Sequence, residues 1–315
     1  MPAVARAHQT EQERLSTQAG RGVREVWSEV DPDDLTGSWA GLLPRLVRLV
    51  VATQAAAAAL SRSYLAELLG EAAPPVAEVV PGALSGTASD GRDLATLLAQ
   101  PMITVLSRID RGESPSRALA AGLLQLETIT RTQVSDTARA ADHVGMAARP
   151  SCVAYTRVVE LPACARCIIL AGRTYPWSTG FQRHPQCDCG MVPMRPGETR
   201  PGINARELFE DMSPAEQARR FGPGGAEAIR EGADLAQVVN ARRGMQSAAA
   251  RNRGRYTTEG TTPRGIAGRR LGDLTSGAGR YRRSSRPRLM PEVIMREART
   301  RDEAIELLRE HGYLS

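Results

Sequence analysis

The stretch CVAYTRVVELPACARCIILAGRTYPWSTGFQRHPQCDCGMVPM, residues 152–194, decides the fold because the periodicity of the chain changes there. Its first nine residues, CVAYTRVVE, alternate in polarity and are rich in β-branched side chains, which predicts a strand. Its last eight, CDCGMVPM, predict another strand. Two strands that flank a turn-rich Cys/His element predict a small α+β core.

The residues before this stretch predict long helices. Leucine and valine recur at spacings of three and four over residues 39–71, with alanine between them, which is typical of a long helix. A second helix is predicted over residues 92–109, with a kink near Pro101. Residues 74–91, rich in Pro, Gly and Ser, are expected to form a linker between the two.

A third long helix is predicted from Pro115 to about Ala148. Ser114 is expected to be its N-cap, since proline favours the first helical position. The apolar residues fall on one face, and Arg131 and Arg139 are expected off that face.

The residues after the stretch predict shorter elements. Ser213 and Glu216 have the spacing of a capping box at the start of a helix. Residues 245–288 are rich in Arg, Gly and Ser and poor in apolar side chains, which predicts a flexible or partner-ordered arm. Two amphipathic helical turns are predicted within residues 291–312.

We therefore predict a mainly α protein with a small α+β core: a helical N-terminal half, a Cys/His-knit, strand-containing domain and a basic irregular C-terminal arm. The predicted divisions are a polar N-terminal segment, a helical domain, an α+β Cys/His domain, an Arg/Gly-rich arm and a C-terminal helical segment, at residues 1–34, 35–150, 151–244, 245–290 and 291–315.

The composition of the 315-residue chain fits this prediction. Aromatic residues make up 4% and hydrophobic residues 42%, which favours a modest core built from long helices. The chain has no lysine, so all 41 basic residues are arginine. Either a GC-rich codon supply or selection for phosphate and carboxylate contacts explains that bias.

The N-terminal sequence MPAVARAHQTEQERL has no apolar run of the kind a signal peptide needs. The most apolar run, residues 49–60, is too short to span a bilayer. We therefore expect a soluble protein of cytosolic origin that makes no membrane contact. In a reducing compartment, clustered cysteines with a histidine favour a metal site over a disulfide.

Four of the five cysteines have the spacing of a metal site. Cys164-x2-Cys167 is followed, after sixteen residues, by His184-x2-Cys187-x-Cys189. A Cys-x2-Cys turn points two thiolates at one place, and zinc binds four such ligands in a tetrahedron. We expect a structural zinc ion bound by the set Cys164, Cys167, His184 and Cys187.

Cys189 is the alternate ligand in this prediction, because a one-residue spacer in an extended strand sends Cys187 and Cys189 to opposite faces. Packed reduced thiols and a disulfide are the other interpretations of the cluster. A catalytic role would need an open metal position or an activated thiol. Cys152 with His143 or His184 is a candidate pairing of a thiol with a base, and no motif supports it. A structural role is favoured.

The string RVVELPACARCIILAGRTYPWSTGFQRHPQCDCGMVPM resembles the Cys/His core of phage minor head proteins of the type of the head-morphogenesis protein F of phage Mu. The matching motifs are the Cys-x2-Cys turn, the LAGR that follows it at residues 170–173, and the closing His-Pro-x-Cys-x-Cys. The segments GADLAQVVNARRGM, TTPRGIAGRR, RLMPEVIMREA and EAIELLREHGYL resemble the actinobacterial phage and prophage version. The resemblance covers roughly residues 115–315.

This resemblance implies a MuF-like minor capsid protein, located inside the virion head after assembly in the host cytoplasm. Its implied partners are the portal protein, other capsid or scaffold proteins, and phage DNA. Some relatives are instead capsid maturation proteases. The sequence has no G-x-S-x-G or H-E-x-x-H motif, which favours a protein that is not an enzyme and leaves the protease as the alternative.

The positive charge of the chain is concentrated in one segment. Residues 242–288 hold thirteen arginines against Glu259 and Asp273, a local charge of +11 within a chain of net charge +6. Such a segment can neutralise phosphates without recognising base sequence, or can be a solvated linker. The candidate residues for binding nucleic acid or a partner are Arg242, Arg243, Arg251, Arg253, Arg255, Arg264, Arg269, Arg270, Arg280, Arg282 and Arg283.

Overall fold

The computed structural model describes residues 2–70, 74–181, 184, 185, 187, 189–198, 204–243, 256–257, 275–276, 283–284, 288–289, 291–311 and 314. The chain divides into two compact units. One is formed by Met1–Glu160 with Gly172–Gly202, and the other by Leu161–Ala171 with Ile203–Ser315.

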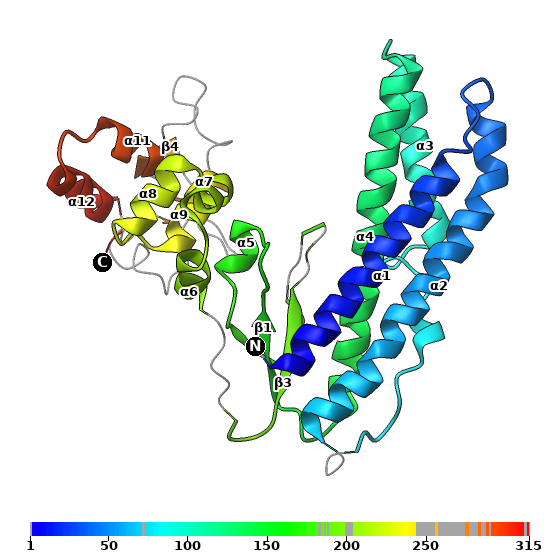
Figure 1. Cartoon of the computed structure of the whole chain (residues 1–315), viewed down its shortest axis with the longest axis horizontal. Helices are drawn as coiled ribbons and strands as arrows, with labels where there is room; N and C mark the ends of the chain where they lie inside the picture. Colours follow the sequence, from blue (N-terminus) through cyan, green and yellow to red (C-terminus); the bar gives the residue numbers. More distant parts are fainter. Residues whose placement is uncertain are drawn as a thin grey trace. The chain divides into compact units, whose positions relative to one another are not determined.

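Four long helices run side by side in the first unit (Figure 1). Helix α4 packs against the other three, and α2 also packs against α1 and α3. The bounds of the four helices are α1 Ala3–Trp27, α2 Leu35–Leu69, α3 Leu94–Asp110 and α4 Pro115–Ala147.

The three long helices predicted from the apolar spacing are confirmed. The spacing places Leu46, Leu98 and Leu126 from three different helices in one fully buried cluster. Helix α2 begins before residue 39 because the Asp34 carboxylate caps it, accepting a hydrogen bond from the Gly37 N–H at 2.9 Å. Ser114 does occupy the N-cap position of α4, but its side chain makes no capping hydrogen bond.

The polar N-terminal sequence also contributes to the bundle. In the second half of α1, Val23, Val26 and Trp27 are buried. The Trp27 ring meets the Trp39 ring edge-on, with their centroids 5.2 Å apart. The segment therefore forms one of the four packed helices.

Helix α2 is long and apolar enough to cross a membrane by length and composition alone. The stripe of α2 that contains Leu46, Val50, Ala57 and Leu65 is fully buried against its neighbours in the unit. Such a stripe is expected where a helix packs against its neighbours.

The segment between α2 and α3 is held by two buried glutamines. Gln54 of α2 accepts a hydrogen bond from the Gly86 N–H at 2.9 Å and donates to the Thr137 hydroxyl at 3.0 Å. Gln133 of α4 accepts from the Ser89 N–H at 2.7 Å. These amides supply the partners that an irregular backbone lacks, so the predicted linker lies fixed on the bundle at this point.

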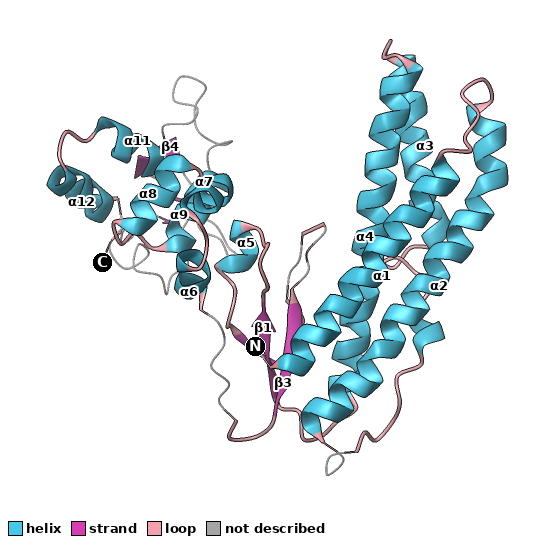
Figure 2. Ribbon diagram, in the orientation of Figure 1, coloured by secondary structure: helices cyan, strands magenta, loops and turns pink. Residues whose placement is uncertain are grey.

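A three-stranded antiparallel sheet completes the first unit (Figure 2). Its order is β2-β1-β3, with Tyr155 opposite Tyr175 on one side and Pro193 on the other. Strand β3 packs against α1, α2 and α4. The two predicted strands are confirmed, and the short β2 is an addition. The strands are β1 Ala154–Val158, β2 Thr174–Pro176 and β3 Gly190–Met194.

The second unit contains several short helices. Ser213 and Glu216 form the predicted capping box at the start of α7, and Asn204 and Glu207 form another at α6. The Phe209 and Phe221 rings pack edge-on in its core. The helices are α5 Ala165–Ile168, α6 Ala205–Glu210, α7 Pro214–Phe221, α8 Pro223–Arg230, α9 Leu235–Arg243, α11 Pro291–Glu297 and α12 Arg301–Glu310.

Most of the predicted basic arm lies outside the described residues. Its described part consists of four two-residue strands in two antiparallel pairs, β4 with β7 and β5 with β6. They are β4 Tyr256–Thr257, β5 Thr275–Ser276, β6 Arg283–Ser284 and β7 Arg288–Leu289. The fold class, mainly α with a small strand-containing core, is confirmed.

Candidate metal centre

The Cys-x2-Cys segment forms a tight turn at the start of α5. Cys164 occupies the N-cap position, and its carbonyl accepts from the N–H groups of Cys167 and Ile168, both at 3.0 Å. This is the tight turn expected when two residues separate two cysteines. Cys167 is buried, and Cys164 is half-buried.

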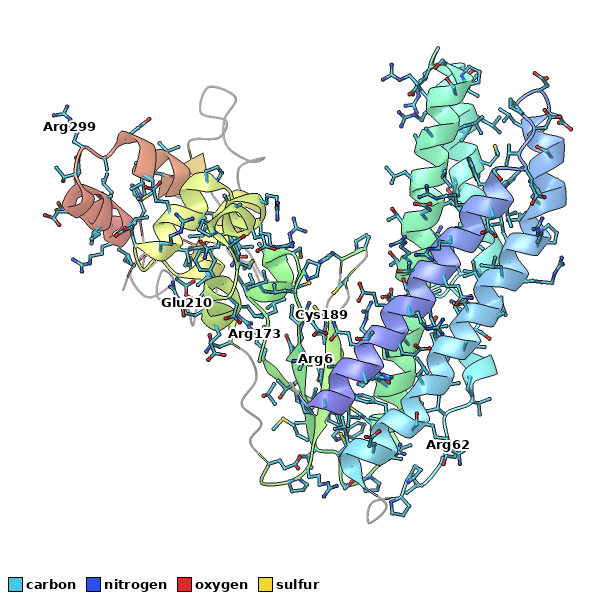
Figure 3. The ribbon with its side chains drawn as sticks, in the orientation of Figure 1. Arg6, Arg62, Arg173, Cys189, Glu210 and Arg299 are labelled. Carbon is cyan, nitrogen blue, oxygen red and sulfur yellow. The ribbon has the colours of Figure 1, made fainter. Side chains whose placement is uncertain are left out.

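The second group of predicted ligands lies just before β3. Figure 3 shows Cys189 at the entry to that strand. Cys187 and Cys189 are buried, and His184 is half-buried. The His184 Nδ1 lies 2.7 Å from the Pro185 carbonyl oxygen. As the donor of this bond, Nδ1 carries the proton, and Nε2 is then the nitrogen with a lone pair for a metal.

The candidate ligands form two groups: Cys164, Cys167 and His184, and Cys167, Cys187 and Cys189. Cys164 and Cys167 fall in the second unit and the other three in the first, where the Cys187 and Cys189 sulfurs lie within 4.8 Å of each other. Cys167 belongs to both groups. In a tetrahedral zinc site, zinc–sulfur bonds of about 2.3 Å put sulfurs roughly 3.8 Å apart. The donor chemistry and spacing fit a metal, so this cluster can hold a metal ion.

Cys189 is expected to be only an alternate ligand because it would face away from Cys187, and this expectation about their faces is wrong. Cys187 and Cys189 share one group of mutually close sulfurs and do not face opposite ways. They precede β3, which begins at Gly190, so strand alternation does not govern them. The choice of four ligands among the five remains a prediction.

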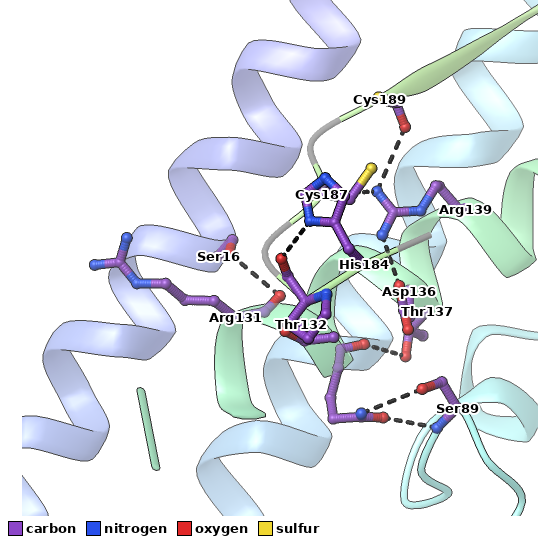
Figure 4. A network of polar contacts seen from close by, with 12 residues as sticks. Ser16, Ser89, Arg131, Thr132, Asp136, Thr137, Arg139, His184, Cys187 and Cys189 are labelled. Carbon is purple, nitrogen blue, oxygen red and sulfur yellow. Dashed lines mark hydrogen bonds and ion pairs between the residues drawn. The ribbon is translucent and has the colours of Figure 1, made fainter. Parts of the chain in front are cut away.

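Two arginines that sequence reasoning did not assign to the site contact this cluster. The spacing along α4 places Arg139 off the apolar face, yet it is 4% exposed. Its guanidinium pairs with the Asp136 carboxylate at 2.6 Å and donates to the Cys187 carbonyl at 2.5 Å (Figure 4). Arg157, on β1, is 1% exposed and donates to the Cys189 sulfur at 3.2 Å.

No local signal marks these two arginines, because arginine occurs throughout the chain. Arg157 lies in an alternating strand, where one expects every second side chain to face solvent. Both faces of β1 are covered, so that rule fails here. Their partners in the segment before β3 lie at sequence separations of 48 and 32 residues, which local spacing does not connect.

The remaining thiol does not show the properties of a nucleophile. Burial raises the pKa of the Cys152 thiol, which disfavours the thiolate. The Cys152 Sγ donates to the Ala154 carbonyl at 3.4 Å. His143 uses its Nε2 for a contact of 2.5 Å with the Trp177 carbonyl. The described contacts therefore give no support to a Cys152–His143 pair.

A second buried polar cluster, also unpredicted, ties α1 to α4. His8 Nε2 lies 3.1 and 3.0 Å from the two carboxylate oxygens of Asp142, and Gln12 donates to Asp142 at 3.2 Å. The His8 ring stacks on Tyr64, with centroids 3.8 Å apart. The imidazole thus serves as both a packing surface and a hydrogen-bond donor.

Most of the arginines predicted to bind nucleic acid or a partner lie outside the described residues. Arg242 and Arg243 lie at the end of α9, and Arg283 lies in β6. The other candidates fall outside the described residues: Arg251, Arg253, Arg255, Arg264, Arg269, Arg270, Arg280 and Arg282.

A family model described as "VG15 protein" matches residues 2–215 of the chain. The match spans the four-helix part, the sheet and both halves of the Cys/His cluster. It ends within α7, before the basic segment. No curated protein and no solved structure matches the chain.

Proposed function

The chain belongs to the VG15 protein family, a family of viral and phage proteins, and we propose that it is a minor capsid or head-morphogenesis protein of a tailed phage or prophage. In this role it associates with the portal protein and other capsid or scaffold proteins in the host cytoplasm and ends inside the virion head. The observation that carries the proposal is the family match over residues 2–215. The likeness of the Cys/His core to MuF-like minor head proteins supports the same role.

The test is the composition of purified phage particles. Quantitative mass spectrometry should find the chain in every full head at a few copies, and deletion of its gene should lower the yield of filled heads. A complementing copy with Cys164→Ser and Cys167→Ser should be incorporated less well, because the core that carries the cluster is weakened. Absence of the chain from intact particles would contradict the proposal.

The alternative within this family resemblance is a capsid maturation protease. Co-expression with the major capsid protein separates the two roles. A minor capsid protein leaves the major capsid protein at full length. Specific shortening that disappears on substitution of one Ser, Cys or His of this chain would replace our proposal with the protease.

We propose further that the metal is a structural zinc ion. Three of the five candidate donors are buried thiols, and zinc prefers such sulfur-rich, closed sites for structural purposes. Elemental analysis of protein purified without added metal should find one zinc per chain.

A second role, general DNA binding, is favoured by the charge of +11 over residues 242–288. Binding through this segment would be independent of base sequence and strongly dependent on salt. Fluorescence anisotropy with two unrelated duplexes should give similar affinities that fall steeply from 50 to about 200 mM salt. Removal of residues 245–290 should abolish this binding, and unchanged binding would reject the role.

A further inference from the structure

Two buried guanidinium groups contact the segment that holds Cys187 and Cys189. Arg139 comes from the middle of α4 and Arg157 from β1, and they are 4% and 1% exposed. Burying an arginine is costly unless hydrogen bonds and negative charge surround it. The groups that these two arginines contact should therefore indicate which kind of ligand the site binds.

Arg139 fixes the backbone of the segment. One terminal nitrogen, Nη2, pairs with the buried Asp136 carboxylate at 2.6 Å. The other, Nη1, donates to the Cys187 carbonyl at 2.5 Å and to the Cys189 carbonyl at 3.4 Å. Figure 4 shows the guanidinium between Asp136 and the two cysteines. The carboxylate orients the arginine, and the arginine holds both cysteine residues in one conformation.

Arg157 contacts the sulfurs themselves. Its Nη2 lies 3.2 Å from the Cys189 Sγ and 3.8 Å from the Cys187 Sγ. The guanidinium also lies over the Phe181 ring, 4.2 Å from the centroid, which restricts its orientation. A single terminal nitrogen that reaches both sulfurs requires them to lie on the same side of the segment.

We propose that Cys187 and Cys189 both bind the metal ion, and that Arg139 and Arg157 are positioning residues that hold this pair of thiolates in place. The inference deepens the metal site and rests on the proposal that this site binds zinc. A metal-bound thiolate keeps its negative charge, and a buried guanidinium donating to its sulfur offsets that charge. Arg139 acts through the backbone and Arg157 through the sulfurs, so their loss should affect the site differently.

The test uses cobalt(II) as a spectroscopic substitute for zinc in the full-length chain. The intensity of the sulfur-to-cobalt charge-transfer band reports the number of bound thiolates. Cys187→Ser and Cys189→Ser should each lower this intensity by the share of one thiolate. Cys152→Ser is the matched control, because it removes a buried thiol that belongs to neither group of candidate ligands. This control should match the natural chain.

The arginine variants are tested by zinc affinity in competition with a chelator. Arg139→Met and Arg157→Met should each weaken zinc binding by roughly 10- to 100-fold, the usual effect of losing a group that orients a ligand. Their cobalt spectra at saturation should keep the natural thiolate count. Arg157→Lys keeps a positive charge near the sulfurs and should recover part of the lost affinity.

Circular dichroism of each variant separates loss of the site from loss of the fold. If Arg157→Met does not fold, the Arg157→Lys variant and the Cys variants still decide whether Cys187 and Cys189 both bind the metal. A Cys189→Ser protein with the natural spectrum and zinc affinity would overturn the proposal and leave Cys189 outside the site. Failure of the natural chain to take up cobalt or zinc would reject the metal site itself, without bearing on its presence in virions.

Discussion

Asp142 carries a carboxylate inside the helical bundle, where it is 1% exposed. Its described partners are His8 and Gln12, both from α1. A buried carboxylate that loses such partners keeps the full cost of its desolvation. The contacts of Asp142 with His8 and Gln12 therefore contribute much of the free energy that packs the first half of α1 on the bundle, since few apolar side chains are buried there.

A double-mutant cycle should measure that contribution. His8→Phe keeps an aromatic ring against Tyr64 but removes the bond to Asp142, and should lower the free energy of unfolding by about 3 kcal/mol. Adding Asp142→Leu should recover at least about 1 kcal/mol, because the unpaired charge is removed. Urea unfolding provides the measurement. Additive effects of the two substitutions would show that the contact contributes nothing.

Glu160→Gln is the control for this cycle. The Arg6–Glu160 pair also ties α1 to a distant segment, at 3.1 Å, but the Arg6 side chain is 59% exposed. Solvent-exposed pairs contribute about 0–1 kcal/mol. The control should therefore lie close to the natural protein in the same experiment.

Tyr155 gives the sheet a pH dependence at high pH. Burial raises the pKa of Tyr155 to about 12. The folded chain therefore holds the phenol proton more tightly than the unfolded chain, in which tyrosine titrates near pH 10. The stabilisation is complete below about pH 10 and is lost as the pH rises toward 12.

Stability measured by urea unfolding between pH 9 and about 11.5 should fall as the phenol is forced to ionise. In Tyr155→Phe the fall should be shallower. This variant also loses the hydroxyl's bond to the Thr179 carbonyl, at 2.6 Å, so its stability at pH 7 should be lower by about 1 kcal/mol. Parallel pH profiles for the two proteins would show that another group governs the alkaline loss.

At the scale of elements, two helical glycines provide opposite tests of packing. A Cβ on Gly122 of α4 would lie 2.5 Å from a Val105 methyl carbon and 2.8 Å from the Trp27 ring. A Cβ on Gly41 of α2 would meet nothing within 4 Å. The first glycine allows α4 to approach α1 and α3 closely, and the second has no such role.

Gly122→Ala should therefore lower stability by about 1–3 kcal/mol through overpacking, even though alanine favours helices. Gly41→Ala should raise stability by roughly 0.5–1 kcal/mol, the usual gain in an exposed helix interior. Thermal unfolding monitored by circular dichroism compares the two. Stabilisation by both substitutions would mean that the bundle relaxes easily around position 122.

The elements differ in how far the sequence predicts them. The helices and their capping boxes depend on residues within about four positions, so apolar spacing and cap residues suffice to find them. The three-residue β2 has too few residues for a pattern, and its pairing with β1 defines it. The fixed course of the segment after α2 depends on Gln54 and Gln133, which local spacing does not connect to it.

At the scale of the whole molecule, a metal ion bound to the candidate ligands would couple metal binding to folding. An ion that binds only the folded chain would add its binding free energy to the stability. With free zinc at about 1,000 times its dissociation constant, the gain is roughly 4 kcal/mol.

Removal of zinc by a chelator should therefore lower the Tm, by roughly 2–4 °C for each kcal/mol in a chain of this size class. Differential scanning fluorimetry with and without chelator provides the measurement. Cys167→Ser should melt at the lower temperature and show little further change with chelator, because Cys167 belongs to both groups of candidate ligands. Identical melting of the natural chain with and without chelator would argue against a structural ion.

The sequence by itself determined the helices, the strand at residue 154, the spacing of the candidate metal ligands and the concentration of positive charge. These properties depend on the identity of neighbours along the chain. The tertiary structure alone decided which polar groups are buried together. His8 meets Asp142 across 134 positions and Arg139 meets Cys187 across 48, and no periodic pattern encodes a pairing at such separations. Burial of a charge is stable only when a distant partner compensates it, so that information exists only in the folded chain.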